Sequence, residues 1–439
     1  MKKNRLVPKL RFPEFRDEGE WEEKNVEDIY DFKSTNSFSR ENLNYKNGVI
    51  KNIHYGDIHK KFNTLFDIVK EDIPFINSNI SIDNIKSDSY CIEGDMIFAD
   101  ASEDIDDIGK SIEIINLSNE KVVSGLHTLL ARQKKAKLIV GFAGYLFKSD
   151  RIRSQIQREA QGSKVFGISV NRISNVCLSF PESFNEQQKI ADCLTSLDQL
   201  ITAETQKLES WKTHKKALMQ KLFPAEGKTV PEWRFPEFRG KEEWEEKTLG
   251  ECSFDSLDYG MNAAAINYDG ENKYIRITDI DENSSKYISE NPVSPEGDLL
   301  DKYIVGENDI LFARTGASTG KTYLYNKEDG KLYFAGFLIR AKIKKDYNPI
   351  FIFTQTQTLK YNKWVKMTSM RSGQPGINSQ EYASYGFFIP SKPEQQKIAD
   401  CLSSLDELIT AQTKKIELLK THKKALMQGL FPDTEEGKK

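Results

Sequence analysis

The sequence predicts an α+β fold in which two mixed α/β domains are separated by two long antiparallel coiled-coil helices, with a pseudo-two-fold internal repeat. The first observation is that residues 186–224 and 394–432 align without a gap and are identical at 31 of 39 positions. The second is that the inserts preceding these segments, about 25–180 and 248–389, barely resemble each other. A constant scaffold thus carries two divergent modules.

Shorter repeated blocks precede each insert, and they are the third observation. Residues 11–16 (Arg-Phe-Pro-Glu-Phe-Arg) return at 234–239, and residues 20–24 (Glu-Trp-Glu-Glu-Lys) return at 243–247. We call these the head blocks. A scaffold held constant twice indicates that it meets the same partner twice, whereas the two inserts meet different things.

The long repeats are predicted to be helices. From Ile190 to Leu222, apolar residues recur at alternating steps of four and three, a period of 3.5 that indicates a narrow coiled-coil seam. About 38 helical residues span ~57 Å. Polar residues interrupt both seams at matching places, and such residues fix register. They are Glu204 and Lys215 in the first copy and Gln412 and Lys423 in the second.

Matching seams make each helix the natural partner of the other, and a two-fold relation between equivalent units runs them antiparallel. The alternatives are a helical hairpin without special purpose and an oligomerisation coil between chains. Each helix ends at Leu-Phe-Pro, where proline stops helical propagation. The predicted segments are a first domain with its head block at 1–180, a first helix at 181–224, a linker, second head block and second domain at 225–389, a second helix at 390–432, and a disordered tail at 433–439.

Both inserts read as mixed α/β because short apolar or alternating runs precede a helical pattern. Each also ends in a glycine- and serine-containing segment followed by a strand. In the first insert we expect strands at 92–99, 122–132 and 176–180 and a helix at 140–159. In the second we expect strands at 273–278, 309–313, 333–343 and 385–389 and a helix at 349–366.

The distribution of charge is more informative than its sum. Net charge is −3, which by itself argues against a nucleic-acid binder. However, residues 132–172 carry ten Lys/Arg against two acids, and residues 340–371 carry eight against one. Residues 93–107, by contrast, carry seven acids and neither Lys nor Arg. Basic stretches that recur late in both inserts fit phosphate contact, although either alone fits ordinary surface charge.

Cysteine usage and hydropathy favour a cytoplasmic protein. No window reaches 18 apolar residues, and no signal peptide is recognisable at the start. The cysteines are too few and too scattered for a disulfide framework, and no pair has metal-binding spacing. They are Cys91, Cys177, Cys193, Cys252 and Cys401.

Several catalytic motifs fail on inspection. The segment 316–322 resembles a phosphate-binding loop, but three residues separate its glycines where the motif needs four. Residues 348–351 (Asn-Pro-Ile-Phe) lack the second proline of an adenine-methyltransferase box and fit a helix start better. His214 and His422 occupy one repeat position on the helices, where surface or partner contact is expected. No catalytic residue and no metal site is predicted.

The repeated Glu-Gln-Gln-Lys-Ile-Ala-Asp run at 186–192 and 394–400, followed by a helix ending in Leu-Phe-Pro, resembles the repeated regions of the DNA-specificity subunit of type I restriction-modification enzymes. The head blocks are also similar to that family, and the order of head, variable module and helix, twice, covers the whole chain. The modules match only in general plan, notably at 306–314. In the first module Asp100 stands where the second has Arg314, which speaks against an arginine contact there.

The resemblance implies a non-catalytic subunit. Each variable module would be a target-recognition domain reading one half of a split, non-palindromic DNA sequence. The paired helices would set the spacing and dock two copies of the methylation subunit, which would bind S-adenosylmethionine and methylate adenine. Restriction subunits would add ATP- and Mg-dependent translocation and cleavage. Equivalent half-sites one turn apart, ~34 Å, lie within the length of such helices.

Candidate DNA contacts are polar or basic residues of the inserts, because phosphate contacts supply affinity and a few polar side chains read base edges. In the second insert they are Arg314, Thr315, Ser318, Lys321, Lys363, Arg371 and Gln374. In the first they are Arg153, Gln157, Arg158, Ser163 and Lys164. The alternative functions are a non-enzymatic coiled-coil adaptor for two different protein ligands and, with less support, a stand-alone nuclease or methyltransferase.

Overall fold

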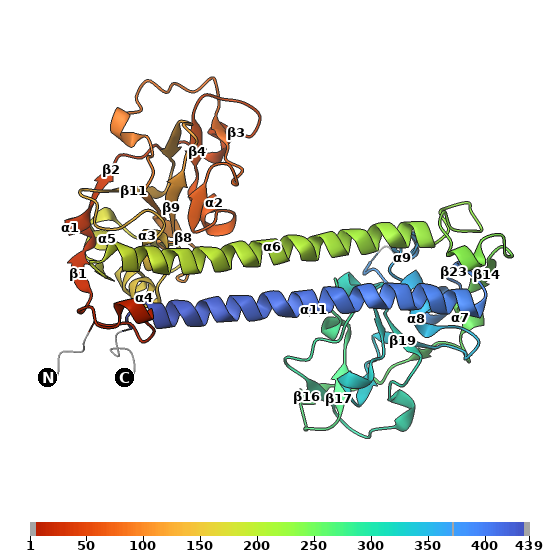
Figure 1. The fold of residues 1–439 in the computed structure, drawn as a ribbon. Coiled ribbons are helices and arrows are strands. Elements are labelled where there is room, and N and C mark those ends of the chain that lie inside the picture. Colours follow the sequence, from red (N-terminus) through yellow and green to blue (C-terminus); the bar gives the residue numbers. More distant parts are fainter. Residues whose placement is uncertain (1–5, 371–372, 434–439) are drawn as a thin grey trace. The chain divides into compact units, whose positions relative to one another are not determined.

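A computed structural model describes residues 6–370 and 373–433 (Figure 1). The chain divides into two compact units. The first comprises Met1–Thr205 and Lys414–Lys439, and the second comprises Gln206–Thr413. The tail beyond residue 433, for which disorder was predicted, lies outside the described residues.

Two helices of 39 residues each dominate the secondary structure: α6 (Phe184–Leu222) and α11 (Lys392–Leu430). The first unit contains the beginning of α6 and the end of α11, and the second unit contains the end of α6 and the beginning of α11. Each unit therefore pairs the first part of one helix with the last part of the other.

Ion pairs across the helices establish that they run antiparallel. In the first unit Asp198 contacts Lys423 at 2.5 Å and Glu204 contacts Lys415 at 2.5 Å. In the second unit Lys215 contacts Asp406 at 2.7 Å. In the first unit rising numbers on α6 meet falling numbers on α11. In the second, Leu222 shares a core cluster with Ile398 while Lys215 meets Asp406, so intramolecular antiparallel pairing is confirmed within each unit.

The polar seam positions have a matched function. Lys215 and Lys423 occupy the same repeat position, as do Asp406 and Asp198, so the two lysine–aspartate pairs are equivalent contacts. Both lysines are mostly buried, and each would lose its counter-ion if the helices slipped by a turn. The seam lysines therefore fix register through a charged partner, as the polar interruptions predicted.

The first domain is built from short strands in several small sheets. Strand orders are β2-β11-β7-β9-β5, β10-β4-β6-β3, β1-β13 and β12-β8. The strands are β1 (Glu22–Asn25), β2 (Tyr30–Lys33), β3 (Leu43–Asn44), β4 (Lys51–Ile53), β5 (Leu65–Asp67), β6 (Phe75–Ile76), β7 (Met96–Ala99), β8 (Ala101–Ser102), β9 (Ser111–Asn116), β10 (Val122–Ser124), β11 (Thr128–Gln133), β12 (Phe166–Gly167) and β13 (Cys177–Phe180). Its helices are α1 (Val26–Ile29), α2 (Tyr55–Lys60), α3 (Ala143–Leu146), α4 (Asp150–Glu159) and α5 (Val170–Ser174).

The second domain follows the same plan with fewer strands. Its orders are β15-β22-β19-β20, β14-β23, β16-β18 and β17-β21. The strands are β14 (Glu245–Thr248), β15 (Asp258–Tyr259), β16 (Ala265–Asn267), β17 (Lys273–Ile275), β18 (Val293–Pro295), β19 (Asp309–Ala313), β20 (Thr322–Leu324), β21 (Leu332–Phe334), β22 (Leu338–Lys342) and β23 (Gly386–Ile389). Its helices are α7 (Leu249–Cys252), α8 (Pro349–Gln355), α9 (Leu359–Thr368) and α10 (Ser379–Ala383).

Several elements predicted as continuous are divided, at corresponding places in both domains. The strand expected at 122–132 is β10 and β11 with a turn at 125–127, and the one at 333–343 is β21 and β22 with a turn at 335–337. The helices expected at 140–159 and 349–366 are likewise α3 with α4 and α8 with α9. Buried apolar residues stand on both sides of each break, so hydrophobic patterning alone does not reveal the break.

The head blocks are tied to the starts of the long helices by buried ion pairs. Arg11 binds Glu186 through two hydrogen bonds of 2.7 Å. Arg234 binds Glu394 in the same way, at 2.9 and 2.6 Å. Both glutamate side chains are 1% exposed. Charge-assisted bidentate pairs of this kind are geometrically specific, which explains why both arginines and both glutamates recur.

The glutamine after each glutamate holds the chain that precedes α3 or α8. Gln187 accepts the N–H of Ile139 at 2.9 Å and donates to the carbonyl of Pro181 at 2.9 Å. Gln395 accepts the N–H of Asn348 at 2.9 Å and donates to the carbonyl of Pro390 at 2.9 Å. Much of the repeated Glu-Gln-Gln sequence is therefore explained by packing within each unit.

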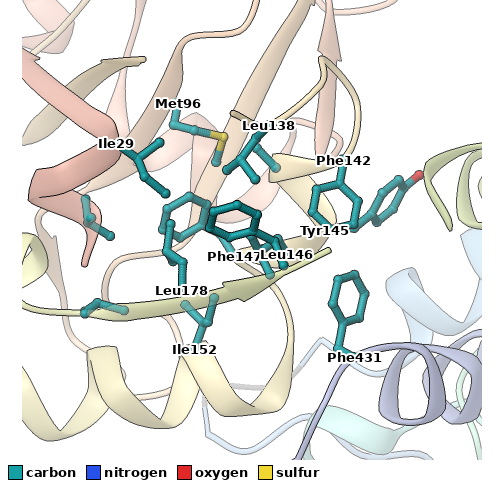
Figure 2. Packing of buried hydrophobic residues seen from close by; sticks show 14 of the residues in the cluster. Ile29, Met96, Leu138, Phe142, Tyr145, Leu146, Phe147, Ile152, Leu178 and Phe431 are labelled. Carbon is teal, nitrogen blue, oxygen red and sulfur yellow. The ribbon is translucent and has the colours of Figure 1, made fainter. Parts of the chain in front are cut away.

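The Leu-Phe-Pro ends of the long helices complete the cores. Phe431 packs against Trp21, with ring centroids 6.1 Å apart. It also packs against Phe142, at 5.9 Å (Figure 2). Phe223 packs against Trp244 and Phe351 in the second unit, at 6.5 and 5.6 Å. Each domain core thus takes its closing aromatic side chain from the end of a long helix. Among the described residues, no helix is long and apolar enough to span a membrane.

Candidate nucleic-acid interface

Two backbone hydrogen bonds in each domain, made by equivalent residues, define a loop that occurs in both. In the first domain, Ala99 receives the N–H of Gly109 at 3.0 Å and donates to Lys110 at 2.9 Å. In the second, Ala313 receives the N–H of Gly320 at 2.9 Å and donates to Lys321 at 2.8 Å. We call residues 100–108 and 314–319 the recognition loops. Their ends are held by equivalent hydrogen bonds, so the residues at the two ends correspond even though the loops differ in length.

The glycines closing these loops allow a helix to approach closely. Gly109 and Gly320 have φ of +62° and +92°. A Cβ at either position would lie 2.6 Å from Ile156 of α4 or 2.5 Å from Val365 of α9. A side chain at either position would therefore push the helix away and strain the backbone.

The first residue of each loop is fixed by the neighbouring turn and by the segment after α4 or α9. Asp100 donates its N–H to His127 at 3.0 Å and accepts from Ile168 at 2.9 Å. Arg314 donates to Phe337 at 3.0 Å and accepts from Ile377 at 2.9 Å. The correspondence of Asp100 with Arg314, suggested by sequence, is thereby established in the structure.

Arg314 lies on an aromatic platform. Its guanidinium carbon is 5.0 Å from the ring centroid of Tyr259, at the end of β15. The hydroxyl of Tyr259 accepts the N–H of Ser379 at 3.1 Å, which fixes the ring and lowers the pKa of Tyr259. Stacking occupies the face of a guanidinium but leaves N–H groups at its edge, so Arg314 is oriented and able to donate further hydrogen bonds.

Asp100 instead lies beside a histidine. Its Oδ1 is 3.1 Å from Nδ1 of His127, and the His127 ring packs edge-on against Tyr55 at 5.3 Å. Burial raises the pKa of Asp100, while His127 acts in the opposite direction. The corresponding place thus holds a hydrogen-bond acceptor in the first domain and a donor in the second.

The loops also differ in length and charge. Loop 100–108 contains five acids, whereas loop 314–319 contains Arg314 and no acid. In the first domain Arg153 donates to the carbonyls of Asp106 and Ile108 at 3.0 and 2.6 Å, and Gln157 donates to the Asp106 carboxylate at 3.0 Å. These two predicted DNA contacts support the acidic loop, so any contact they make with DNA remains a prediction.

The other predicted residues of the first domain lie outside this loop. Arg158 is exposed near the end of α4, and Ser163 and Lys164 are exposed in the segment between α4 and β12. That segment leads directly to Ile168, which binds the Asp100 backbone. These three residues stay predictions.

Three predicted residues of the second domain lie around Arg314. Thr315 forms a β-bridge with Gly376, and the carbonyl of Ser318 accepts the N–H of Lys321 at 3.0 Å. The amide nitrogen of Gln374 lies 2.9 Å from where a Cβ on Gly316 would stand. The structure therefore brings the loop and the residue 373–377 segment together, as a site requires.

The other three predicted residues of the second domain lie outside the loop. Lys363 is an exposed residue of α9. Its ion-pair partner, at 3.0 Å, is Glu226, which does not belong to the recognition loop. Arg371 lies outside the described residues. Lys321 has an ion pair with Glu282 at 3.8 Å. Sequence reasoning missed Tyr259 and His127, because each reaches the loop through strand pairing or a turn distant in sequence.

Two other motifs are resolved by geometry. Asn348 accepts the N–H of Phe351 at 3.0 Å and caps α8, which confirms that Asn-Pro-Ile-Phe is a helix start. His214 and His422 are exposed on the long helices, which confirms a surface position. Neither belongs to the recognition loops.

Comparisons with known proteins agree with this architecture. The model of the family described as "Type I restriction modification DNA specificity domain" matches residues 18–211 and 241–421. The putative type I restriction enzyme MjaX specificity subunit of Methanocaldococcus jannaschii is 25% identical over 351 residues, which is 77% of this chain and 78% of the relative.

Solved structures show the same fold. A crystal structure of a type I restriction-modification system S subunit from M. genitalium has a TM-score of 0.61 at 16% identity, covering 98% of this chain and 100% of that one. A chain from a study of complex assembly and conformational transition of the type I R-M system has a TM-score of 0.56 at 13% identity, covering 94% and 97%.

Proposed function

Because the chain belongs to the type I restriction-modification DNA specificity family, we propose that its two domains read the two halves of an asymmetric bipartite DNA site. The observation that carries this is the pair of recognition loops held by the same hydrogen bonds but presenting Asp100 in one domain and Arg314 in the other. Identical frames with opposite chemistry would make a palindromic target unfavourable, since each half would need the same base contacts.

We propose that phosphate contacts are made by exposed residues outside the loops. Arg158, Ser163 and Lys164 are exposed in the first domain, as is Lys363 in the second. Such contacts supply affinity that falls with salt but carry no sequence information. Base reading is assigned to the recognition loops, where side chains are oriented by fixed partners.

The exposed part of the repeat supports a partner bound twice. Packing explains why the buried residues of the two helices are identical. It does not explain Thr213, His214 and Lys216, which are exposed and return as exposed residues in α11. Leu200 and its equivalent Leu408 are also identical and are 42% and 46% exposed. We propose that these outward residues dock one methylation subunit on each unit, giving two copies per chain.

The chain itself is proposed to be non-catalytic. Methyl transfer from S-adenosylmethionine to adenine would occur on the methylation subunits, and ATP- and Mg-dependent cleavage would occur on restriction subunits joined through the complex. No cofactor would bind this chain. A location in the cytoplasm, where chromosomal and incoming DNA are met, follows from this proposal.

The function is tested by sequencing the methylome of cells that express this chain with its methylation subunit. We expect one new split, non-palindromic methyl-adenine motif. Exchange of residues 248–389 for those of a relative should change one half of that motif and leave the other half unchanged. The absence of any new split motif would contradict the proposal and favour a protein-binding adaptor.

Docking is tested by Leu200→Asp and Leu408→Asp, singly and together, with complex mass measured by light scattering. Each single variant should retain one methylation subunit and the double variant none. Leu418 is 62% exposed but is serine in the other repeat, so Leu418→Asp is the matched control and should retain both subunits. Two retained copies in the double variant would exclude this surface.

A further inference from the structure

The first residue of each recognition loop occupies the same place in its domain but carries the opposite charge. Ala99 and Ala313 precede it, and Gly109 and Gly320 close the loop behind it. The side chain there belongs to Asp100 or Arg314. Two further backbone hydrogen bonds on each of these residues fix its main chain, which preorganises the side chain for recognition.

Base-edge chemistry assigns different partners to the two side chains. An arginine has donors only and forms a bidentate pair with O6 and N7 of guanine, whereas a carboxylate accepts from the N4 amine of cytosine. Tyr259 holds the Arg314 guanidinium by its face at 5.0 Å, and Nη1 donates to the carbonyl of Gly336 at 3.5 Å, so the other N–H groups at the edge are left for such a pair. His127 engages one oxygen of Asp100 at 3.1 Å, and a carboxylate has capacity for further donors.

We propose that Asp100 and Arg314 are the corresponding specificity-determining residues of the two domains, with Arg314 reading a guanine and Asp100 a cytosine. The inference rests on the proposed function and adds the identity of one base in each half-site. Tyr259 and His127 act as positioning residues, because each orients the reading side chain and need not touch DNA.

The local charges fit this division of labour. Loop 314–319 has no acid, so it can approach phosphates, and Lys321 follows after the closing Gly320. Loop 100–108 has five acids, which repel phosphates and leave acceptance from a base amine as the favourable contact for Asp100. The first domain is therefore expected to take its phosphate contacts elsewhere, as at Lys164.

The test selects binding sites from a randomised duplex library, using the full chain bound to its methylation subunits. Amides pair bidentately with adenine, so Arg314→Gln should change one guanine to adenine, and Asp100→Asn should change one cytosine to adenine in the other half. Arg314→Ala should reduce discrimination at that guanine by roughly ten- to hundredfold. Lys363→Ala is the control and should weaken binding to all sequences alike.

The outcomes distinguish failure of this base assignment from failure of the proposed bipartite DNA recognition. If the wild type selects a split motif and both amide variants select the same one, the inference is overturned. Changes confined to a single half in both variants would also overturn it. If the wild type selects no split motif, the proposed function fails and this inference with it.

A second variant guards against misfolding. Tyr259→Leu removes the platform without altering Arg314 and should lower the guanine preference severalfold while the other half-site is read as before. An unchanged guanine preference in Tyr259→Leu, with Arg314→Ala also unchanged, would show that this position does not read DNA.

Discussion

Glu186 and Glu394 occupy one repeat position, and each binds an arginine of its own head block in a buried setting. Asp100 and Arg314 also occupy one structural position, yet their charges are opposite. The first pair belongs to the frame that supports each domain, and the second to the loops that the frame presents. The difference teaches that repeat identity marks a shared structural requirement and that divergence at fixed positions marks a difference in what is bound.

The frame is most severely broken by removing one member of a buried ion pair. Glu186→Ala leaves Arg11, 6% exposed in its side chain, without its partner, and should destabilise the first unit by about 3–5 kcal/mol. Glu394→Ala should do the same to the second unit. Chemical denaturation followed by fluorescence of the native tryptophans would measure both.

Lys189→Ala provides the control for these variants, since Lys189 makes an exposed pair with Glu14 and should cost less than about 1 kcal/mol. Replacing both Arg11 and Glu186 by apolar residues should recover much of the loss, because no buried charge is then left unpaired. A loss in Glu186→Ala no larger than that in Lys189→Ala would refute the assignment.

The pH dependence of stability should differ between the two domains because the first contains a buried glutamate, Glu113. Glu113 accepts the N–H groups of Gly141 and Gly144 at 2.9 and 2.7 Å, and burial raises its pKa to about 7. The folded state therefore holds a proton that the unfolded state releases near pH 4.5, so this group's contribution to stability falls as pH rises from about 4.5 through about 7. Each unit of separation corresponds to about 1.4 kcal/mol.

Glu113→Gln removes this titration. The stability of the wild type relative to Glu113→Gln should fall by roughly 3 kcal/mol across that window, measured as denaturation midpoints at successive pH values. Leu324 lies three residues after Lys321, as Glu113 lies three residues after Lys110, so it is the corresponding position of the second domain. Leu324→Ala removes no titrating group and should therefore lower stability by the same amount at each pH. A constant difference between wild type and Glu113→Gln would contradict the shifted pKa.

The smallest effect is expected at the helix seam. Lys215→Met and Lys423→Met each remove one of two equivalent, partly exposed ion pairs, and each should cost up to about 1 kcal/mol. The double variant Lys215→Met/Lys423→Met should lose more stability than a pair of substitutions that leaves the helix register unaffected, because both lysine–aspartate pairs are then absent. Pairwise distances between spin labels on α6 and α11 would detect a slipped register, and an unchanged distance distribution in the double variant would exclude this role.

Much of the frame is predictable from the chain alone. The 3.5-residue period over Ile190–Leu222 predicts the helix, and matching interruptions at Lys215 and Lys423 predict register-fixing contacts. Their aspartate partners are not predictable, because Asp198 and Asp406 lie beside the seam and meet the lysines only once the antiparallel alignment is set.

The recognition loops are less accessible to sequence reasoning. Arg314 is recognisable as a basic residue after a strand, but its platform is Tyr259, which reaches it because β15 and β19 both pair with β22. The turn carrying Phe337 is hidden within a continuous apolar run, and Gly336 is the one local signal for it. Long-range strand pairing, which depends on the folded sheet, decides these contacts.

The placement of Phe431 has a consequence for the order in which the protein is made. The second unit, Gln206–Thr413, is one uninterrupted stretch, whereas the first needs Lys414 and the residues after it to supply Phe431 to its core. More than 200 residues separate Thr205 from Phe431. At ~5–20 residues per second, ribosomal synthesis of that stretch takes tens of seconds. Of the two domains, the one that emerges first is thus completed last, because on a ribosome it waits until Phe431 has been made.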